Sequence, residues 1–340
     1  MKKIMIYLIL LTSVSSAAIK TAVYWTSPVM AMTVVPKLAK FDLVIVDAEN
    51  MVNNYQVLDS LKRSNHQIIL LAYWNAQEVW ESDRTPNRPI QNALIDSLQA
   101  KYPSWYLKTA NGRSAVFYPR MLMMNMSDQC PVYHIAGKSY NYREWITAFL
   151  LKTVLSDPIW NGYFLDNGGG NVSWVSDGID ADYDGQPDES FILDHYWSRG
   201  VYRHLLTIRA AKGKNFIIIA NKGSVEFMDV LNGRKFEGFS NEYLGDSTDH
   251  GWWQSMANAH QTGPYTILQA ERERDLDFVL ASALMLDHDV FVAVGQNNPT
   301  WYQQFDKKFQ VGGKIKVVRE QDGQRIEIIP SQKTGQVMQK

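Results

Sequence analysis

The chain contains 340 residues, of which 46% are hydrophobic, 20% charged and 12% aromatic. This composition excludes a disordered, collagenous or coiled-coil protein and supplies enough apolar material for a large core. The 34 basic and 35 acidic residues nearly cancel, so the chain lacks the basic field expected of a nucleic-acid-binding protein. Cys130 is the single cysteine, which excludes an intrachain disulfide and a cysteine-rich metal site.

The first residues have the three parts of an export signal. Lys2 and Lys3 supply the positive end, residues 4–11 form an apolar run, and small residues lead to Ala17. The apolar run is too short to span a bilayer, and no later segment reaches about 20 apolar residues. We expect a signal peptide over 1–17, a secreted or periplasmic mature chain, and no membrane anchor after cleavage. A buried first strand is the alternative interpretation.

Eight short apolar runs follow along the mature chain, with helix-like stretches between them. Near-continuous apolar strands are typical of a parallel sheet that is covered on both faces. Strands that alternate with helices indicate βαβ units with right-handed crossovers. Eight such units predict an α/β fold, a (β/α)8 TIM barrel over residues 18–310. The predicted strands are 22–26, 43–47, 68–74, 162–166, 216–220, 236–241, 265–270 and 290–294.

Two regions lie outside the eight-unit pattern. Residues 75–142 form a long third connection, which we expect to be functional or to pack over the barrel mouth. Residues 311–330 contain two strand-like runs around Asp322-Gly323, a dipeptide that favours a type I′ turn, and therefore predict a small C-terminal β-hairpin. Residues 331–340 are expected to be a polar, mobile tail.

Polar and aromatic side chains follow the ends of the predicted strands. In a (β/α)8 barrel these positions meet at one mouth, where the active site lies. Aromatic faces cover pyranose rings, amides bind hydroxyls, and two carboxyls run acid–base chemistry at a glycosidic bond, so the set predicts a sugar site. The expected substrate-binding residues are Trp25, Asp47, Glu49, Tyr73, Trp74, Asn167, Asn221, Lys222, Asn241, Tyr243, Glu271 and Gln296.

Two carboxyls carry the strongest functional signal. Asp166 closes an apolar strand and precedes three glycines, 168–170, which let a ligand approach the backbone. Glu242 follows the sixth predicted strand. We predict Asp166 as the nucleophile or base and Glu242 as the general acid of a glycosidase pair. A carboxylate after a strand is also a common helix N-cap, and this alternative applies to Asp47, Glu49 and Glu271.

An acidic loop follows the fourth predicted strand. Asp180, Asp182, Asp184 and Asp188 alternate around Gly185, as the ligands of a calcium loop do. The register departs from an EF-hand, which requires Glu where Phe191 stands. A structural calcium site, a solvated acidic turn and a loop that shapes the sugar site all remain open, and no other cofactor is required.

Several stretches together resemble a known family. They are FDLVIVDAE (41–49), WYLKTANG (105–112), GYFLDNGGG (162–170) with the acidic loop, FEGFSNEYL (236–244) and VVREQDGQRIEIIP (317–330). The chain resembles the hypothetical glycosyl hydrolase-like proteins of family 15 and, more distantly, the endo-α-1,4-polygalactosaminidase group. The resemblance implies a (β/α)8 barrel, glycosidase activity, and a strand-four Asp and strand-six Glu, here Asp166 and Glu242, as catalytic carboxyls.

The sequence therefore predicts a secreted glycoside hydrolase that cleaves a poly- or oligosaccharide with two carboxylates. The expected partner is the carbohydrate substrate and not a nucleic acid, and the sequence indicates no oligomeric state. A carbohydrate-binding barrel without turnover and a polysaccharide lyase are the alternatives. A carboxyl separation of about 5–5.5 Å favours retention of anomeric configuration, and about 6.5–9.5 Å favours inversion.

We predict that the exported chain begins at Ala18 or Ile19, because the basic end, apolar run and small residues occur in the order that signal peptidase reads. Mass spectrometry of protein from its native host measures the N-terminus directly. Intact Met1 on cytoplasmic protein would contradict the prediction.

Overall fold

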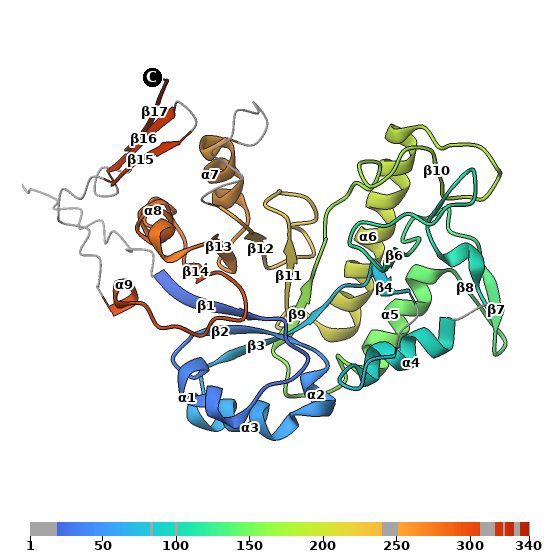
Figure 1. The fold of residues 1–340 in the computed structure, drawn as a ribbon, viewed down its shortest axis with the longest axis horizontal. Coiled ribbons are helices and arrows are strands. Elements are labelled where there is room, and N and C mark those ends of the chain that lie inside the picture. Colours follow the sequence, from blue (N-terminus) through green and yellow to red (C-terminus); the bar gives the residue numbers. More distant parts are fainter. Residues whose placement is uncertain are drawn as a thin grey trace, which may run out of the picture.

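A closed barrel of eight parallel strands forms the centre of the protein (Figure 1). The computed structural model describes residues 19–81, 84–98, 101–239, 251–306, 317–321, 324–329 and 334–339. Around the barrel the strand order is β1, β2, β3, β9, β11, β12, β13 and β14, and β14 pairs with β1 to close the ring. The predicted (β/α)8 fold is confirmed.

The barrel strands follow the apolar runs of the sequence, with one correction. The sixth strand covers Gly233–Phe236, whereas the sequence pattern predicted 236–241. Arg234 and Lys235 occupy half of this strand, and both are fully buried. Because these two charged residues interrupt the apolar run, the apolar pattern predicts a strand that begins too late. The strands are β1 (Ile19–Trp25), β2 (Leu43–Asp47), β3 (Ile69–Trp74), β9 (Gly162–Leu165), β11 (Ile217–Asn221), β12 (Gly233–Phe236), β13 (Thr266–Ala270) and β14 (Val290–Val294).

Helices cover the outside of the barrel, and the longer ones pack against it through an apolar face. In α3, for example, Val57, Leu58 and Leu61 are buried, which is the spacing of one helix face. The connection from β11 to β12, residues 222–232, contains no helix and is the one departure from eight complete units in the described chain. The covering helices are α1 (Val35–Leu38), α2 (Asn50–Asn53), α3 (Tyr55–Ser64), α5 (Tyr142–Thr153), α6 (Ser190–Lys212), α7 (Trp252–Gln261), α8 (Leu276–Ala283) and α9 (Gln303–Asp306).

Alternate side chains of the strands fill the barrel interior. Tyr24, Leu71 and Phe164 belong to a buried cluster that is separate from the clusters under the helices. Lys235 joins these aromatic rings, since its Nζ lies 3.9 Å from the ring centroid of Tyr24 and 5.8 Å from that of Phe164. The interior of the barrel therefore holds a cation directly below the mouth.

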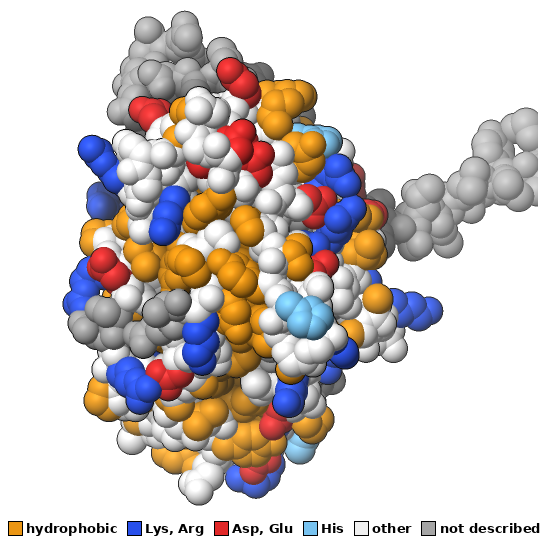
Figure 2. All heavy atoms as spheres, turned by 90° about the vertical axis from the view of Figure 1, so that its right-hand side faces the viewer, with side chains coloured by type: hydrophobic (Ala, Val, Ile, Leu, Met, Phe, Trp, Pro, Cys, Tyr) orange, Lys and Arg blue, Asp and Glu red, His pale blue; other side chains and the backbone are white. Residues whose placement is uncertain are grey.

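The long third connection forms a separate lobe beside the barrel, to the right in Figure 1. Its strand β4 pairs with β6, and β5 pairs with β10 of the loop after β9, which ties the two connections together. On the outer face of this side, hydrophobic side chains gather along the middle between charged ones (Figure 2). The elements are β4 (Glu78–Trp80), α4 (Pro89–Leu98), β5 (Lys108–Thr109), β6 (Met121–Met123), β7 (Tyr133–Ile135), β8 (Lys138–Tyr140) and β10 (Ile179–Asp180).

The C-terminal region is a three-stranded antiparallel sheet of β15 (Val317–Gln321), β16 (Gln324–Ile329) and β17 (Thr334–Gln339). The first two strands are the predicted hairpin, and its Asp322-Gly323 turn lies outside the described residues. The expectation of a mobile tail over 331–340 is wrong for β17, because β16 offers its second edge and satisfies the backbone of this polar segment. In the described part of the chain, no helix has both the length and the apolar character to cross a membrane.

Gly162 is the position where a side chain would most directly break the barrel. A Cβ there would lie 2.0 Å from the carbonyl oxygen of Ile217 on the paired strand. We expect Gly162→Ala to lower the free energy of unfolding by at least about 1–3 kcal/mol, as overpacking does. Gly251→Ala is the matched control, because nothing lies within 4 Å of a Cβ at that position. Equal urea midpoints for the two variants would contradict the prediction.

Candidate active site

Three neighbouring strands place polar side chains at the mouth of the barrel. Asp166 follows β9, Asn221 ends β11, and Glu237 follows β12. Each is succeeded by a residue with positive φ, a conformation that costs free energy at Asn167 and Lys222 but not at a glycine, and such strain is concentrated at functional sites in proteins. These turns stop the strand and leave the preceding side chain at the rim. The residues are Asn167 (φ 52°), Lys222 (φ 90°) and Gly238 (φ 59°).

One amide joins two carboxyls at this rim. Asn221 Nδ2 donates to Asp166 Oδ1 at 2.9 Å and to Glu237 Oε2 at 2.6 Å. The two oxygens therefore lie no more than 5.5 Å apart, the length of the path through this nitrogen. The hydroxyl of Tyr73 donates to the other oxygen of Asp166 at 2.7 Å. This upper limit is compatible with the about 5–5.5 Å of a retaining glycosidase and is shorter than the about 6.5–9.5 Å of an inverting one.

Glu237 is held as a carboxylate by its neighbours. Lys235 Nζ, inside the barrel, lies 3.4 Å from Glu237 Oε2, and Gln296 Nε2 donates to Oε1 at 2.9 Å. Burial would raise the pKa of Glu237, but the Lys235 cation and the hydrogen bonds from Asn221, Lys235 and Gln296 outweigh it and lower the pKa. The side chain is 36% exposed, so a bound ligand can reach it.

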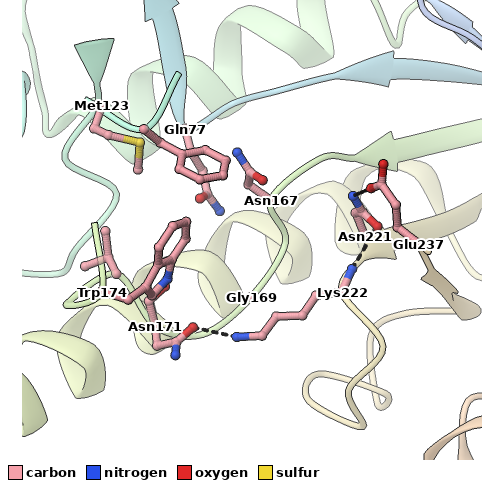
Figure 3. Close-up of a pocket in the computed structure, with 11 residues that line it drawn as sticks. Gln77, Met123, Asn167, Gly169, Asn171, Trp174, Asn221, Lys222 and Glu237 are labelled. Atoms are coloured by element: carbon pink, nitrogen blue, oxygen red, sulfur yellow. Dashed lines mark hydrogen bonds between the residues drawn. The ribbon is translucent and has the colours of Figure 1, made fainter. Parts of the chain in front are cut away.

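A cavity of about 390 Å³ opens beside Glu237; we call it the larger cavity (Figure 3). Trp174 lies across the cavity from Asn221 and Glu237 in Figure 3, and Phe117 also lines the cavity. The two rings are 4.8 Å apart in an edge-to-face arrangement and are 38% and 54% exposed. Exposed aromatic faces opposite amides and a carboxylate suit a sugar ring. The lining residues are Gln77, Phe117, Met123, Asn167, Gly169, Asn171, Val172, Trp174, Asn221, Lys222 and Glu237.

A smaller cavity of about 190 Å³ borders Tyr73, Glu78 and Trp80. Arg88 also lines it; its Nη1 lies 3.2 Å from Asp47 Oδ2, and its guanidinium lies 6.0 Å from the Trp80 ring centroid. Tyr73 of the smaller cavity and Asn221 of the larger one bind opposite oxygens of Asp166. The carboxyl of Asp166 is therefore hydrogen-bonded to one lining residue of each cavity, although Asp166 itself lines neither.

The structure brings many of the predicted residues to these cavities and places others elsewhere. Asn167, Asn221 and Lys222 line the larger cavity, Asp47, Tyr73 and Trp74 line the smaller one, and Gln296 binds Glu237. Trp25 donates its indole N–H to Val29, and exposed Glu271 lines neither cavity. Asn241, Glu242 and Tyr243 lie outside the described residues.

Glu49 has a structural position. It is fully buried, and its two oxygens accept hydrogen bonds from the backbone N–H groups of Ile90 and Gln91, both at 2.8 Å. These donors lie in the first turn of α4, where N–H groups have no partner within the helix. Burial raises the pKa of Glu49 to about 7 despite these bonds.

Glu237, Glu78 and the aromatic pair were not among the predicted site residues. Glu237 was placed inside the sixth strand, because that strand was predicted to start only at residue 236. Because β12 ends at Phe236, Glu237 is the first residue after the strand, at the mouth of the barrel. Phe117 and Trp174 come from different connections, so their proximity has no local sequence signal.

The acidic loop gathers three of its four carboxylates. Oxygens of Asp180, Asp182 and Asp184 all lie within 4.8 Å of one another. Asp188 Oδ2 accepts from the backbone of Ala181 at 2.7 Å. Burial and neighbouring acids raise the pKa of Asp182 and of Asp188, which a bound cation would reverse. Calcium at this loop stays a prediction.

If the loop binds calcium in the folded state alone, calcium raises the melting temperature by mass action. We expect the rise to disappear in the Asp182→Asn/Asp184→Asn variant and to persist in Asp177→Asn, which changes an acid of the same loop outside the cluster. Thermal melts with calcium and with chelator measure this. No calcium-dependent change in the wild type, together with no heat of binding in titration calorimetry, would contradict it.

One family model matches most of the chain. The model of hypothetical glycosyl hydrolase family 15 matches residues 62–314, more than half of the chain. None of the curated proteins compared with the chain matches it. Among solved structures, the chain is similar to a noncanonic maltogenic alpha-amylase AmyB from Thermotoga neapolitana, with 11% identity, 92% of this chain and 85% of that chain covered, and a TM-score of 0.48.

Two other solved structures have lower scores. The chitinase domain of the spore coat protein CotE from Clostridium difficile has 10% identity, 92% and 78% coverage, and a TM-score of 0.35. The HpcH/HpaI aldolase from Desulfitobacterium hafniense DCB-2 has 9% identity, 83% and 87% coverage, and a TM-score of 0.32. At these scores the similarities carry no functional argument.

Proposed function

Because the chain belongs to hypothetical glycosyl hydrolase family 15, we propose that it hydrolyses glycosidic bonds of a poly- or oligosaccharide with Asp166 and Glu237 as its two carboxyls. The observation that carries the proposal is the bridge through Asn221, which keeps the two carboxyls within reach of one bond. The alternative acid from the sequence pattern, Glu242, lies outside the described residues and enters the experiment below for comparison.

In this proposal Asp166 is the nucleophile. Tyr73, Asn221 and the backbone N–H of Asn167 all donate to it, so it is a fixed carboxylate with little freedom to move. It attacks the anomeric carbon while the bond to the leaving oxygen breaks, and a glycosyl ester forms on Asp166. Fixed donors that need no rearrangement are an efficient way to position a nucleophile.

Glu237 is the acid and then the base. A sugar over Glu237 removes water from a carboxyl that is 36% exposed in the free protein, and this desolvation raises its pKa. The protonated group then gives its proton to the leaving oxygen. In the second step Glu237 takes a proton from water, the water oxygen attacks the anomeric carbon, and Asp166 is released as a carboxylate. The anomeric configuration is retained.

The two cavities support a substrate with more than one sugar. Asp166 is hydrogen-bonded to Tyr73 of the smaller cavity and to Asn221 of the larger one, so in this proposal sugar rings bound in the two cavities place the glycosidic bond at the carboxyl pair. The aromatic rings of Phe117 and Trp174 cover one ring in the larger cavity. We further propose that the chain acts outside the cytoplasm, supported by the signal-like residues 1–17.

We expect Asp166→Asn and Glu237→Gln each to cut turnover on a glycan panel by at least about 10²–10⁴-fold, since each removes a proton-transfer or nucleophilic group. Glu189→Gln, an exposed acid outside both cavities, is the control. Circular dichroism checks that each variant folds, and NMR of the first product should show retained configuration.

The same experiment separates the alternatives. Loss of turnover in Glu242→Gln with full turnover in Glu237→Gln would assign the acid to Glu242. Full turnover in Asp166→Asn would exclude the two-carboxyl mechanism. An unsaturated product would identify a lyase, and glycan binding without any product would identify a binding protein.

A further inference from the structure

A third carboxyl, Glu78, reaches this site from the lobe that the long third connection forms, which we call the inserted lobe. It lies on β4, is 1% exposed and borders the smaller cavity. Asn167 Nδ2 donates to Glu78 Oε2 at 2.9 Å, and the backbone N–H of the same Asn167 donates to Asp166 Oδ1 at 3.0 Å. One residue therefore binds Glu78 with its side chain and Asp166 with its backbone.

Asn167 is in a conformation that needs support. Its φ of 52° lies in the left-handed region, which costs free energy for a residue other than glycine. Glu78 fixes the Asn167 side chain, and Asn75 Nδ2 binds the same oxygen of Glu78. The turn that aims the backbone N–H at Asp166 is thus anchored to a different part of the chain.

We propose that Glu78 is a positioning residue for Asp166 and that, acting through Asn167, it holds the strand-four turn in place. The inference rests on the proposed function in one respect, that Asp166 is the nucleophile. It gives the inserted lobe a role in the reaction, because Glu78 of this lobe fixes the position of Asp166. Glu78 itself does not attack the sugar.

The surroundings of Glu78 favour its neutral form. Burial raises its pKa to about 7 despite the hydrogen bond from Asn75, and the nearby Asp166 carboxylate raises it further. The other charged groups at the smaller cavity, Asp47 and Arg88, are paired with each other, and Met123 stands opposite Glu78 on β6. Three further titratable side chains belong to segments near Glu78. Tyr73 donates its hydroxyl to Asp166, and Tyr118 and Arg120 lie just before β6, the strand that pairs with β4.

Ionisation of Glu78 would place a second negative charge beside Asp166. The two carboxylates repel each other, so Asp166 moves from its position for attack. A misplacement of about 1 Å costs on the order of 10²-fold in rate. Turnover should therefore fall as the pH rises through about 7, the pKa of Glu78.

Two substitutions test the proposal. Glu78→Gln keeps an oxygen that can accept from Asn167 but removes the charge, whereas Glu78→Leu removes both. We expect Glu78→Leu to lower kcat by about 10²-fold with a smaller change in KM, and Glu78→Gln to restore kcat and extend activity to higher pH. Glu81→Gln, an exposed neighbour, is the control. Equal kcat in the wild type and Glu78→Leu, or an unshifted pH profile in Glu78→Gln, would overturn the proposal.

A second measurement does not depend on activity. The folded-state pKa of Glu78 lies above its ordinary value of 4.5, so the native state binds the extra proton and loses stability as the pH rises from 4.5 through about 7. The urea midpoint of Glu78→Gln should therefore rise relative to the wild type over this range. Carboxyl ¹³C NMR should show two titrations near pH 7, those of Glu49 and Glu78. The one that vanishes in Glu78→Gln should move to lower pH in Asp166→Asn, while that of Glu49 should stay. An unmoved titration in Asp166→Asn would show that the two groups are uncoupled.

The outcomes separate this inference from the proposed function. If no glycan is cleaved, the hydrolase proposal fails, while the stability and NMR data still decide whether Glu78 and Asp166 form one unit. If Asp166→Asn abolishes turnover and the Glu78 variants behave as the wild type, the hydrolase proposal stands and the role of Glu78 is wrong.

Discussion

Closure of the barrel is the constraint on which the site depends. β1 pairs with β2 on one side and with β14 on the other, so every strand is fixed in direction and register relative to its neighbours. Because all eight strands are parallel, their carboxyl ends share one rim. Asp166, Asn221 and Glu237 come from consecutive strands of that ring, which is why a single amide can bind both carboxyls.

The buried cation below the mouth links the core to the chemistry. Lys235 has no exposed surface, and placing a charge there is costly unless it is paired. Glu237 and the face of the Tyr24 ring provide the pairing. The dependence is mutual, because Lys235 also keeps the pKa of Glu237 low. Lys235 also makes β12 atypical as a barrel strand. The same side chain therefore stabilises the ionised form of Glu237 and interrupts the apolar pattern by which the strand would be predicted.

The loops at the barrel mouth supply the remaining walls of the two cavities. The inserted lobe contributes Glu78 and Phe117, and the loop after β9 contributes Trp174. Fully buried Arg234 donates to the carbonyls of Gly168 and Asn221, which ties the turns after β9 and β11 to each other. Strand pairing between β5 and β10 joins the lobe to the same loop. The cavity walls are therefore held by backbone and buried side chains rather than by exposed contacts alone.

The sequence by itself determined the barrel, seven of its eight strands and the place of Asp166 at a strand end, because apolar strands and the glycines after them are local patterns. It did not determine the partner of Asp166. The proximity of Glu237 depends on the register of β12 beside β11, and the raised pKa of Glu78 depends on its burial where the inserted lobe meets the barrel mouth. Distances and desolvation of this kind arise between segments that are remote in the chain. Only the tertiary structure decided which carboxyls meet and which of them are shielded from water.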